Sequence, residues 1–313
     1  MAKKQKATYR ITNWREYNES LVRRGDITLW FEEDVLSAWA HANSDVKVGR
    51  PFIYSDTAIE CLLSLRELFR LPYRQTEGLG RALMKLMEVE VAIPSFTLLA
   101  KRAAKLKVAL NVADSSGPLQ MVVDSTGLKI VGAGEWRSFA YRHPKRRTWR
   151  KLHLSINPAT QEIVAELLTS KSLDDAAQVH KLLDQVTGPV EKLYADGAYD
   201  KWSLYDLLKR QAIEPVIPPR RNAAIKQHGN CTAPRLSRDE AVRGIRRLGR
   251  KAWKRQVGYH RRSLVETSIY RLKQYFGDHL KNKAFANQQT EVRLRCKILN
   301  HFTQLGMPNF RWN

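Results

Sequence analysis

A run of strand-like and helix-like segments between residues 119 and 219 most constrains the fold of this chain. Segment 119–131, LQMVVDSTGLKIV, is apolar and β-branched, which is typical of a buried strand. Segments 149–157 and 162–170 also have strand patterns, and helix and strand patterns then alternate up to residue 219. Three successive strands followed by this alternation predict an α/β fold with a mixed sheet and flanking helices.

Two aspartates stand where apolar segments of this predicted sheet give way to turn-forming residues. Asp124 precedes the sequence Ser-Thr-Gly, and Asp196 precedes Gly197. We expect both side chains at the carboxyl ends of neighbouring strands, where ligands converge. Either aspartate alone also has a structural interpretation, because Asp commonly caps helices and forms turns.

A third acid, Glu266, lies in the very basic segment 259–276, YHRRSLVETSIYRLKQYF. If this segment is one helix, Tyr259, Arg262, Glu266 and Lys273 lie on one side of it, next to an apolar stripe. This arrangement presents a carboxylate to a cleft while the cationic side chains meet phosphates. The alternative is a surface glutamate that makes an (i, i+4) pair.

Together, Asp124, Asp196 and Glu266 supply the hard oxygen ligands that suit Mg²⁺ or Mn²⁺. Two such ions can stabilise the attacking and leaving oxygens of a phosphodiester displacement. The sequence therefore predicts a site with two Mg²⁺ ions, for which Mn²⁺ can substitute.

The spacing Tyr259–x2–Arg262–x3–Glu266–x6–Lys273 resembles the C-terminal signature of the DDE transposases of bacterial insertion sequences. The strings VVDSTGLKI and YADGAYD resemble the first and second acidic motifs of that family. RRTWRKLHLSIN is similar to the stretch after the first Asp in the insertion-sequence five group of the four/five superfamily. The resemblance extends over about residues 50–305.

The resemblance implies a ribonuclease H-like core with Asp124, Asp196 and Glu266 as catalytic, metal-binding triad. It also implies that Tyr259, Arg262 and Lys273 bind phosphates near the cleavage site. Asp200, four residues after Asp196, fits the second motif less well.

Related enzymes with hairpin intermediates use Trp residues to hold a flipped base. Ser263 stands directly after Arg262, where such a Trp would be expected. Trp253 is therefore a candidate DNA-binding residue, with packing beneath the basic insertion as the alternative.

A net charge of +23 predicts a polyanionic partner, and nucleic acid is favoured over a membrane because no lipid-anchor pattern is present. Residues 220–262 hold fourteen Lys or Arg against two acids, which favours a DNA-contacting insertion over a merely solvated or partly disordered one. A second basic segment, 141–153, is predicted to follow the DNA backbone, with edge protection as the alternative. Its predicted contacts are Lys145, Arg146, Arg147, Arg150 and Lys151.

Three domains are expected. Residues 1–117 form a helical region, interpreted as DNA-binding through a helix-turn-helix or as a plain bundle. Residues 118–280 form the catalytic domain, with the basic insertion at about 218–255, and residues 281–313 form a final helix and tail.

These features predict a transposase that binds terminal inverted repeats, cuts the element ends and joins the 3′-hydroxyls to target DNA. The alternatives are a structure-selective nuclease or resolvase on the same core, and a domesticated DNA-binding regulator. A basic RNA-binding protein fits the charge but leaves the three acids unexplained. We expect a homodimer on DNA in the cytoplasm, associated with the nucleoid. Three dispersed cysteines and the lack of an 18-residue apolar run agree with that location.

Overall fold

The computed structural model describes residues 9–31, 33–43, 51–114, 117–131, 149–229 and 231–312. The chain divides into a smaller unit, formed by Met1–Leu99 with Ile298–Asn313, and a larger unit, Ala100–Lys297. Within the described ranges, every helix is too short or too polar to cross a membrane.

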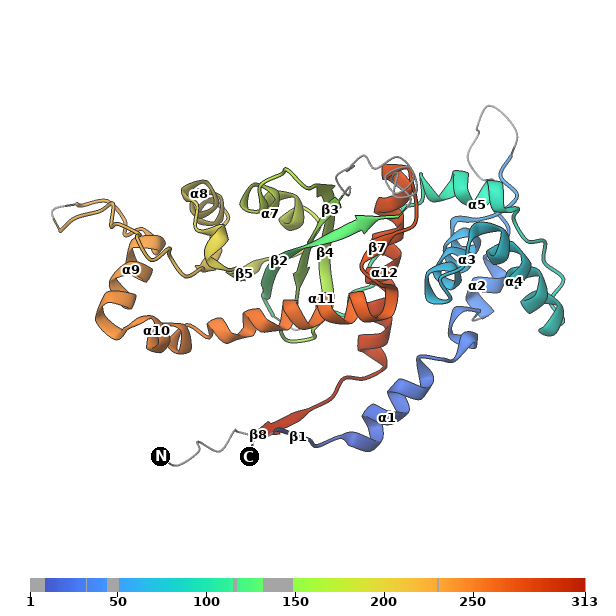
Figure 1. The fold of residues 1–313 in the computed structure, drawn as a ribbon, viewed down its shortest axis with the longest axis horizontal. Helices are drawn as coiled ribbons and strands as arrows, with labels where there is room; N and C mark the ends of the chain where they lie inside the picture. The colour runs from blue at the N-terminus through green and yellow to red at the C-terminus, as the bar shows by residue number, and fades with distance from the viewer. Residues whose placement is uncertain are drawn as a thin grey trace, which may run out of the picture. The chain divides into compact units, whose positions relative to one another are not determined.

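A mixed sheet of six strands forms the centre of the larger unit (Figure 1). Its spatial order is β4-β3-β2-β5-β6, and β7 pairs with the far end of β2. The strands are β2 (Leu119–Ile130), β3 (Trp149–Ile156), β4 (Ile163–Ser170), β5 (Val190–Tyr194), β6 (Glu214–Val216) and β7 (His279–Leu280).

The strand directions follow from how the chain connects them. β2, β3 and β4 pair antiparallel. β5 and β6 are parallel to β2, and helices α7 (Asp175–Leu183) and α8 (Trp202–Arg210) make the crossovers. This topology confirms the predicted mixed sheet and agrees with the expected ribonuclease H-like fold.

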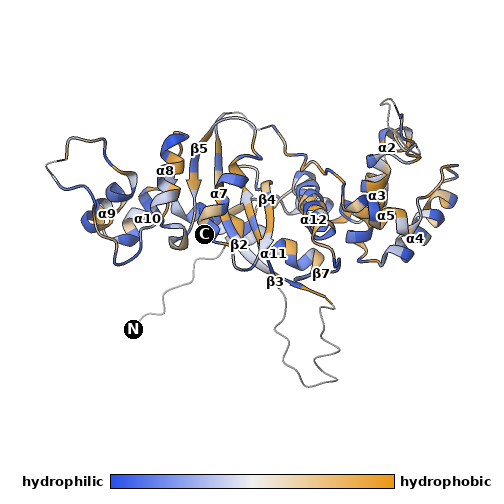
Figure 2. Cartoon of the chain, turned by 90° about the horizontal axis from the view of Figure 1, so that it is seen from above, coloured by the Kyte–Doolittle hydropathy of each residue, from blue (hydrophilic) through white to orange (hydrophobic). Residues whose placement is uncertain are grey.

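Helices cover both faces of this sheet. Figure 1 shows α7 and α8 on one side and α11 (Ser263–Phe276) on the other. The apolar core beneath α7 and α8 includes Met121, Val179, Leu193 and Leu208, each with no exposed side-chain surface. In Figure 2 the orange of apolar residues is clear in β4, as expected for a strand buried on both faces.

The basic insertion is helical from Ser237 to Gln256, with a break at Gly249. It contains α9 (Ser237–Leu248) and α10 (Arg250–Gln256), joined at Gly249, which adopts a φ of 79°. Trp253 is 6% exposed and packs against Gly244 between the two helices. The alternative of a partly disordered insertion is therefore wrong for these helices, because they share a small core of their own.

The smaller unit is mostly helical. Its short strands β1 (Tyr9–Ile11) and β8 (Phe310–Trp312) pair antiparallel. Its other elements are α1 (Trp14–Arg23), η1 (Ile27–Trp30), α2 (Glu33–Ser37), α3 (Asp56–Leu68) and α4 (Tyr73–Leu86). Helices α5 (Phe96–Ala103) and α12 (Phe285–Leu305) each continue from one unit into the other.

Candidate active site

Asp124 lies inside β2 and not at its end, which corrects the position expected from the sequence. The strand runs on to Ile130 because β3 keeps pairing with it up to Lys129. On the other edge, however, β5 pairs with β2 only as far as Val122. Asp124 therefore follows the last β5 pair, where one edge of β2 is no longer covered by β5.

Asp196 follows β5 by two residues and caps the short 3₁₀ helix η2 (Gly197–Tyr199). Its Oδ1 accepts a hydrogen bond of 2.8 Å from the Ala198 N–H. Because β5 is parallel to β2, Asp196 lies toward the same end of the sheet as Asp124.

Glu266 lies in the first turn of α11, and its side chain is 52% exposed. The helix starts at Ser263, later than predicted, because the preceding residues Tyr259–Arg262 form the 3₁₀ helix η3. Gly258 precedes η3 with a φ of 67°, a left-handed conformation that favours glycine. The four signature residues are thus carried by two helical segments in place of one.

Arg262 connects two of the three acids. Its Nη1 donates to Asp124 Oδ2 over 3.0 Å, and its Nη2 donates to Glu266 Oε1. The side chain of Arg262 is 18% exposed, so it is largely removed from solvent. The link brings β2 and α11 together at one point, as the predicted site requires.

Burial and neighbouring charges shift the pKa values of Asp124 and Tyr259. Burial raises the pKa of the Asp124 carboxyl; the Ser125 N–H and Arg262 oppose this shift, and the charge of Asp196 adds to it. Burial likewise raises the pKa of Tyr259, with Arg262 opposing. The negative charges of the acids raise it further, and the contributing side chains are Asp196, Glu266 and Asp124.

Lys273 lies two turns after Glu266 on α11 and also reaches β2. Its Nζ donates to Thr126 Oγ1 over 2.6 Å. Thr126 is two residues beyond Asp124, so Lys273 places a second cation near the first acid. The structure therefore brings Arg262, Glu266 and Lys273 to the stretch of β2 around Asp124.

Within the described ranges, no group of three or more His, Cys, Asp or Glu is placed to hold a metal ion. Arg262 pairs with the carboxylates of Asp124 and Glu266, while Asp196 directs one oxygen to the backbone. The donors nevertheless fit a divalent ion in chemistry, since all are carboxylate oxygens and two already bind a cation.

The predicted DNA contacts of the basic segment 141–153 have two different outcomes. Lys145, Arg146 and Arg147 lie outside the described residues. Arg150 donates to Gln288 Oε1 over 2.9 Å, and Lys151 binds the Leu173 carbonyl and the Asp175 carboxylate. Arg150 and Lys151 thus bind partners within the larger unit. DNA contact by the segment 141–153 stays a prediction.

The buried position of Trp253 does not agree with the interpretation that it binds DNA. Its ring is buried between α9 and α10, so this structure presents no face of it for stacking on a base. The packing alternative is the one that the structure supports, because Gly244 leaves room for the ring.

Two polar contacts next to the site were not expected from the sequence. Asp200 forms a buried ion pair with Arg238 of the insertion. His153, with no exposed surface, bonds Thr169 Oγ1 and lies opposite Ser125 in the sheet. The only available signal for Asp200 was its place at the end of the second acidic motif.

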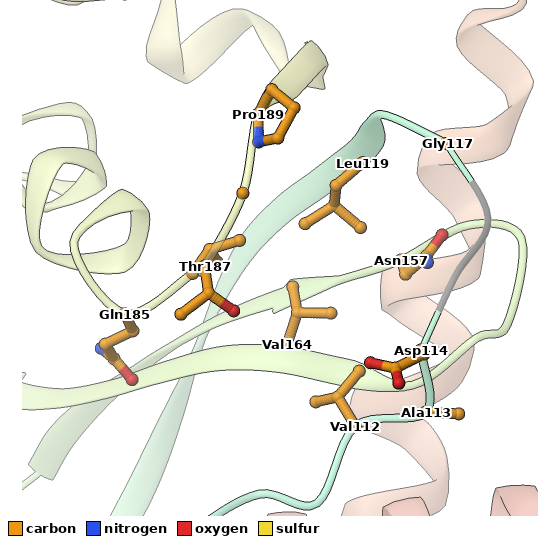
Figure 3. Close-up of a pocket in the computed structure, with 12 residues that line it drawn as sticks. Val112, Ala113, Asp114, Gly117, Leu119, Asn157, Val164, Gln185, Thr187 and Pro189 are labelled. Carbon is orange, nitrogen blue, oxygen red and sulfur yellow. The ribbon is translucent and has the colours of Figure 1, made fainter.

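A pocket lies at the opposite end of β2 and β5 (Figure 3). Leu119 and Pro189 line it at the start of these strands, and Gln185 and Thr187 line it from the loop before β5. Asp114 is its single acid, so this pocket lacks the cluster of carboxylates expected of the predicted site.

Comparison with known proteins gives two family matches and a structural one. Residues 115–301 and, separately, residues 22–133 match models described as a transposase DDE domain. The chain is also similar to the cryo-electron microscopy structure of a piggyBac transposase synaptic complex with hairpin DNA. That alignment has 10% identity and a TM-score of 0.38, and it covers 91% of this chain and 74% of the other.

The first match includes all three acids and the whole signature from Tyr259 to Lys273, and it extends over more than half of the chain. The chain belongs to the family of DDE transposases.

Proposed function

We propose that this protein binds the terminal inverted repeats of a mobile element, cuts the DNA at the element ends and joins the freed 3′-hydroxyls to target DNA. The observation that carries the proposal is the double contact of Arg262, which donates to both Asp124 and Glu266, with Asp196 following the parallel strand next to β2. Acids from two separate segments meet one cation there, and electrostatic stabilisation of this kind is a main part of phosphoryl transfer.

Asp124, Asp196 and Glu266 are the proposed ligands of divalent ions. Mg²⁺ or Mn²⁺, two per site, would supply charge neutralisation of the phosphate and an activated oxygen nucleophile. Glu266 is half exposed and Asp124 is 20% exposed, so incoming groups can reach both carboxylates. Family membership supports a requirement for divalent ions in general, and the number and identity of the ions belong to this proposal.

The cationic side chains have a role that does not depend on the ions. Arg262 and Lys273 lie beside the acids and can each donate to phosphate oxygens. The ring of Tyr259 packs beneath Lys254, whose ammonium lies 4.5 Å from the ring centre. These groups would orient the scissile strand, and positioning is the main contribution that a protein makes to phosphoryl transfer.

DNA is the proposed partner of the exposed basic surface of α9 and α10. Its exposed cations include Arg246, Arg247, Lys251 and Arg255. Lys and Arg on such a surface bind phosphates and release counterions, so binding should weaken steeply with salt. Two ends require two active sites, and we therefore propose a homodimer on DNA.

Oligonucleotide cleavage tests the proposed function. The substrate is linear DNA that carries the short inverted repeats flanking the coding region, incubated with Mg²⁺. We expect nicking at the repeat ends and joining of the 3′-ends to a second duplex. Asp124→Ala, Asp196→Ala and Glu266→Ala should each abolish both reactions while DNA binding survives; near-wild-type cleavage by any variant removes that residue from the triad.

Branched DNA without repeats separates this proposal from its first alternative. A structure-selective nuclease would cut the branched substrate in preference and would not join strands. A DNA-binding regulator would bind the repeats but cut neither substrate.

A further inference from the structure

A buried ion pair links the second acidic motif to the basic insertion. Arg238 of α9 donates from Nε to Asp200 Oδ1 over 2.7 Å and from Nη2 to Oδ2 over 3.0 Å. The side chain of Asp200 has no exposed surface, and that of Arg238 is 11% exposed. A two-pronged contact of this kind fixes orientation as well as distance.

Further contacts complete the surroundings of both charges. The Arg220 N–H donates to Asp200 Oδ2 over 2.9 Å, and Arg238 Nη1 donates to the Ala224 carbonyl over 3.1 Å. The guanidinium also lies 4.7 Å from the ring centre of Trp202, at the start of α8. Asp200 and Arg238 therefore join the end of η2, the entry to the insertion and α8.

Asp200 and Asp196 stand at the two ends of one short turn. Asp196 is the N-cap of η2 and Asp200 is its C-cap, with only Gly197–Tyr199 between them. The turn is also packed tightly, because a Cβ added at Gly197 would lie 3.3 Å from the Pro218 carbonyl oxygen. Asp200 and Asp196 are thus joined through three residues of a tightly packed turn.

We propose that Asp200 and Arg238 are positioning residues, which lock the basic insertion to the turn that carries Asp196. This inference rests on the proposed function, in which Asp196 is a ligand of the divalent ions. DNA contacts on α9 and α10 and the second acid of the site are then held as one rigid piece. Asp200 acts through Asp196 and touches neither DNA nor the reacting phosphate.

The first test uses Asp200→Asn and Arg238→Gln in the full-length protein. Each removes one charge of the pair, so the turn loses its anchor. We expect turnover on repeat-end DNA to fall by about 10- to 100-fold, as for a small misplacement of a catalytic group. The Mg²⁺ concentration for half-maximal cleavage should rise several-fold, whereas the affinity for repeat-end DNA should change little.

Two further variants distinguish positioning from a general loss of charge. The double variant Asp200→Asn/Arg238→Gln should be no worse than the poorer single variant, because both substitutions break one interaction. Arg235→Gln is the matched control. It removes a cation from the same insertion, but Arg235 is 80% exposed and lies 3.7 Å from its partner Glu240. We expect it to leave the Mg²⁺ dependence unchanged.

Amide hydrogen exchange tests, without a measurement of activity, whether the ion pair of Asp200 and Arg238 anchors the turn. The amides of residues 197–201 should exchange faster in both single variants than in the wild type, with the strands of the sheet unchanged. If Asp200→Asn does not fold, Arg238→Lys, which keeps the charge but not the two-pronged contact, serves in the same assay. Unchanged exchange at residues 197–201 together with an unchanged Mg²⁺ dependence would overturn the proposal.

The two proposals fail in different ways. If the wild type does not cleave repeat-end DNA with Mg²⁺, the proposed function fails, and the exchange measurement still decides whether the pair anchors the turn. If the wild type cleaves and the variants match it in both readouts, only the positioning role fails.

Discussion

Arg262 lies 3.0 Å from Asp124 through Nη1 and Oδ2, although 138 positions separate the two residues in the chain. The same guanidinium also binds Glu266. The guanidinium of Arg262 thus neutralises part of the charge of two acids that are far apart in the sequence. This arrangement leads to a prediction about the competition between Arg262 and divalent ions.

Arg262→Gln should lower the thermal stability of the protein in the absence of divalent ions, because Asp124 and Glu266 lose their shared counter-charge. Added Mg²⁺ should then raise the melting temperature more in the variant than in the wild type, since a ligand stabilises the state that it binds. Thermal melts with and without Mg²⁺ measure this difference.

Arg261→Gln is the control for that experiment. Arg261 is the neighbouring exposed arginine, and its hydrogen bond goes to Gln120 Oε1. Added Mg²⁺ should raise the melting temperature of Arg261→Gln by as much as that of the wild type. An equal Mg²⁺ response in both variants would show that Arg262 and the ions do not compete for the same carboxylates.

Acid should destabilise the fold through His153. Burial lowers the pKa of His153 to about 4; nearby Asp175 opposes this shift, Lys151 adds to it and Asp174 opposes it. The folded-state pKa is below the unfolded value, so His153 contributes stability that is complete above about pH 6.5 and is lost as the pH falls toward 4. The loss should be on the order of 3 kcal/mol at most.

Urea unfolding at pH 7 and pH 5 measures this contribution, with His153→Gln as the comparison. Glutamine can keep a hydrogen bond to Thr169 but cannot take up a proton. The wild type should lose more stability on acidification than the variant does. Parallel losses in the two proteins would exclude His153 as the source.

The buried pair of Glu291 and Arg295 should be essential for the stability of the larger unit. Glu291 is fully buried, and its oxygens accept from Arg295 and from the N–H groups of Lys281 and Asn282. Glu291→Gln leaves a buried cation without its partner, so the free energy of unfolding should fall by about 3–5 kcal/mol.

Chemical denaturation measures that loss, and Glu191→Gln provides the contrast. Glu191 is 44% exposed and lies 3.8 Å from Lys192, so its substitution should cost less than about 1 kcal/mol. Similar losses of unfolding free energy in the two variants would contradict the burial of Glu291.

Gly244→Ala should destabilise the insertion. A Cβ at this position would lie 2.8 Å from the Trp253 ring, too close for the ring to stay where it packs. Overpacking of this kind costs about 1–3 kcal/mol. Gly78→Ala in α4 is a matched helical control, since nothing lies within 4 Å of its Cβ. It should raise stability by about 0.5–1 kcal/mol, and thermal melts of both variants test the opposite signs.

The sequence was sufficient for strands β2 to β6, for the helices between them and for the signature, but not for the contacts between them. Apolar patterns predicted the three antiparallel strands and the later crossovers, because side-chain periodicity reflects burial directly. The spacing from Tyr259 to Lys273 identified the candidate residues. Asp124 was misplaced at a strand end, since the extent of β2 depends on pairing with β3, which its own residues do not encode.

The sequence did not predict the ion pairs between residues that are far apart in the chain. Arg262 was assigned to phosphates, and its ion pair with Asp124 depends on how α11 packs on the sheet. Arg238 lies among fourteen cations with no local feature that marks it as the partner of Asp200. Charge composition predicts a basic surface, whereas the choice of one buried partner depends on tertiary structure.

The central claim is that Asp124, Asp196 and Glu266 bind the same divalent ions. Anomalous scattering from crystals of the full chain grown with repeat-end DNA and Mn²⁺ tests it most directly. The account predicts Mn²⁺ peaks at about 2.0–2.3 Å from carboxylate oxygens of all three residues, with Arg262 displaced from at least one of them. Peaks that leave out any one of the three acids, or lie elsewhere in the chain, would contradict it.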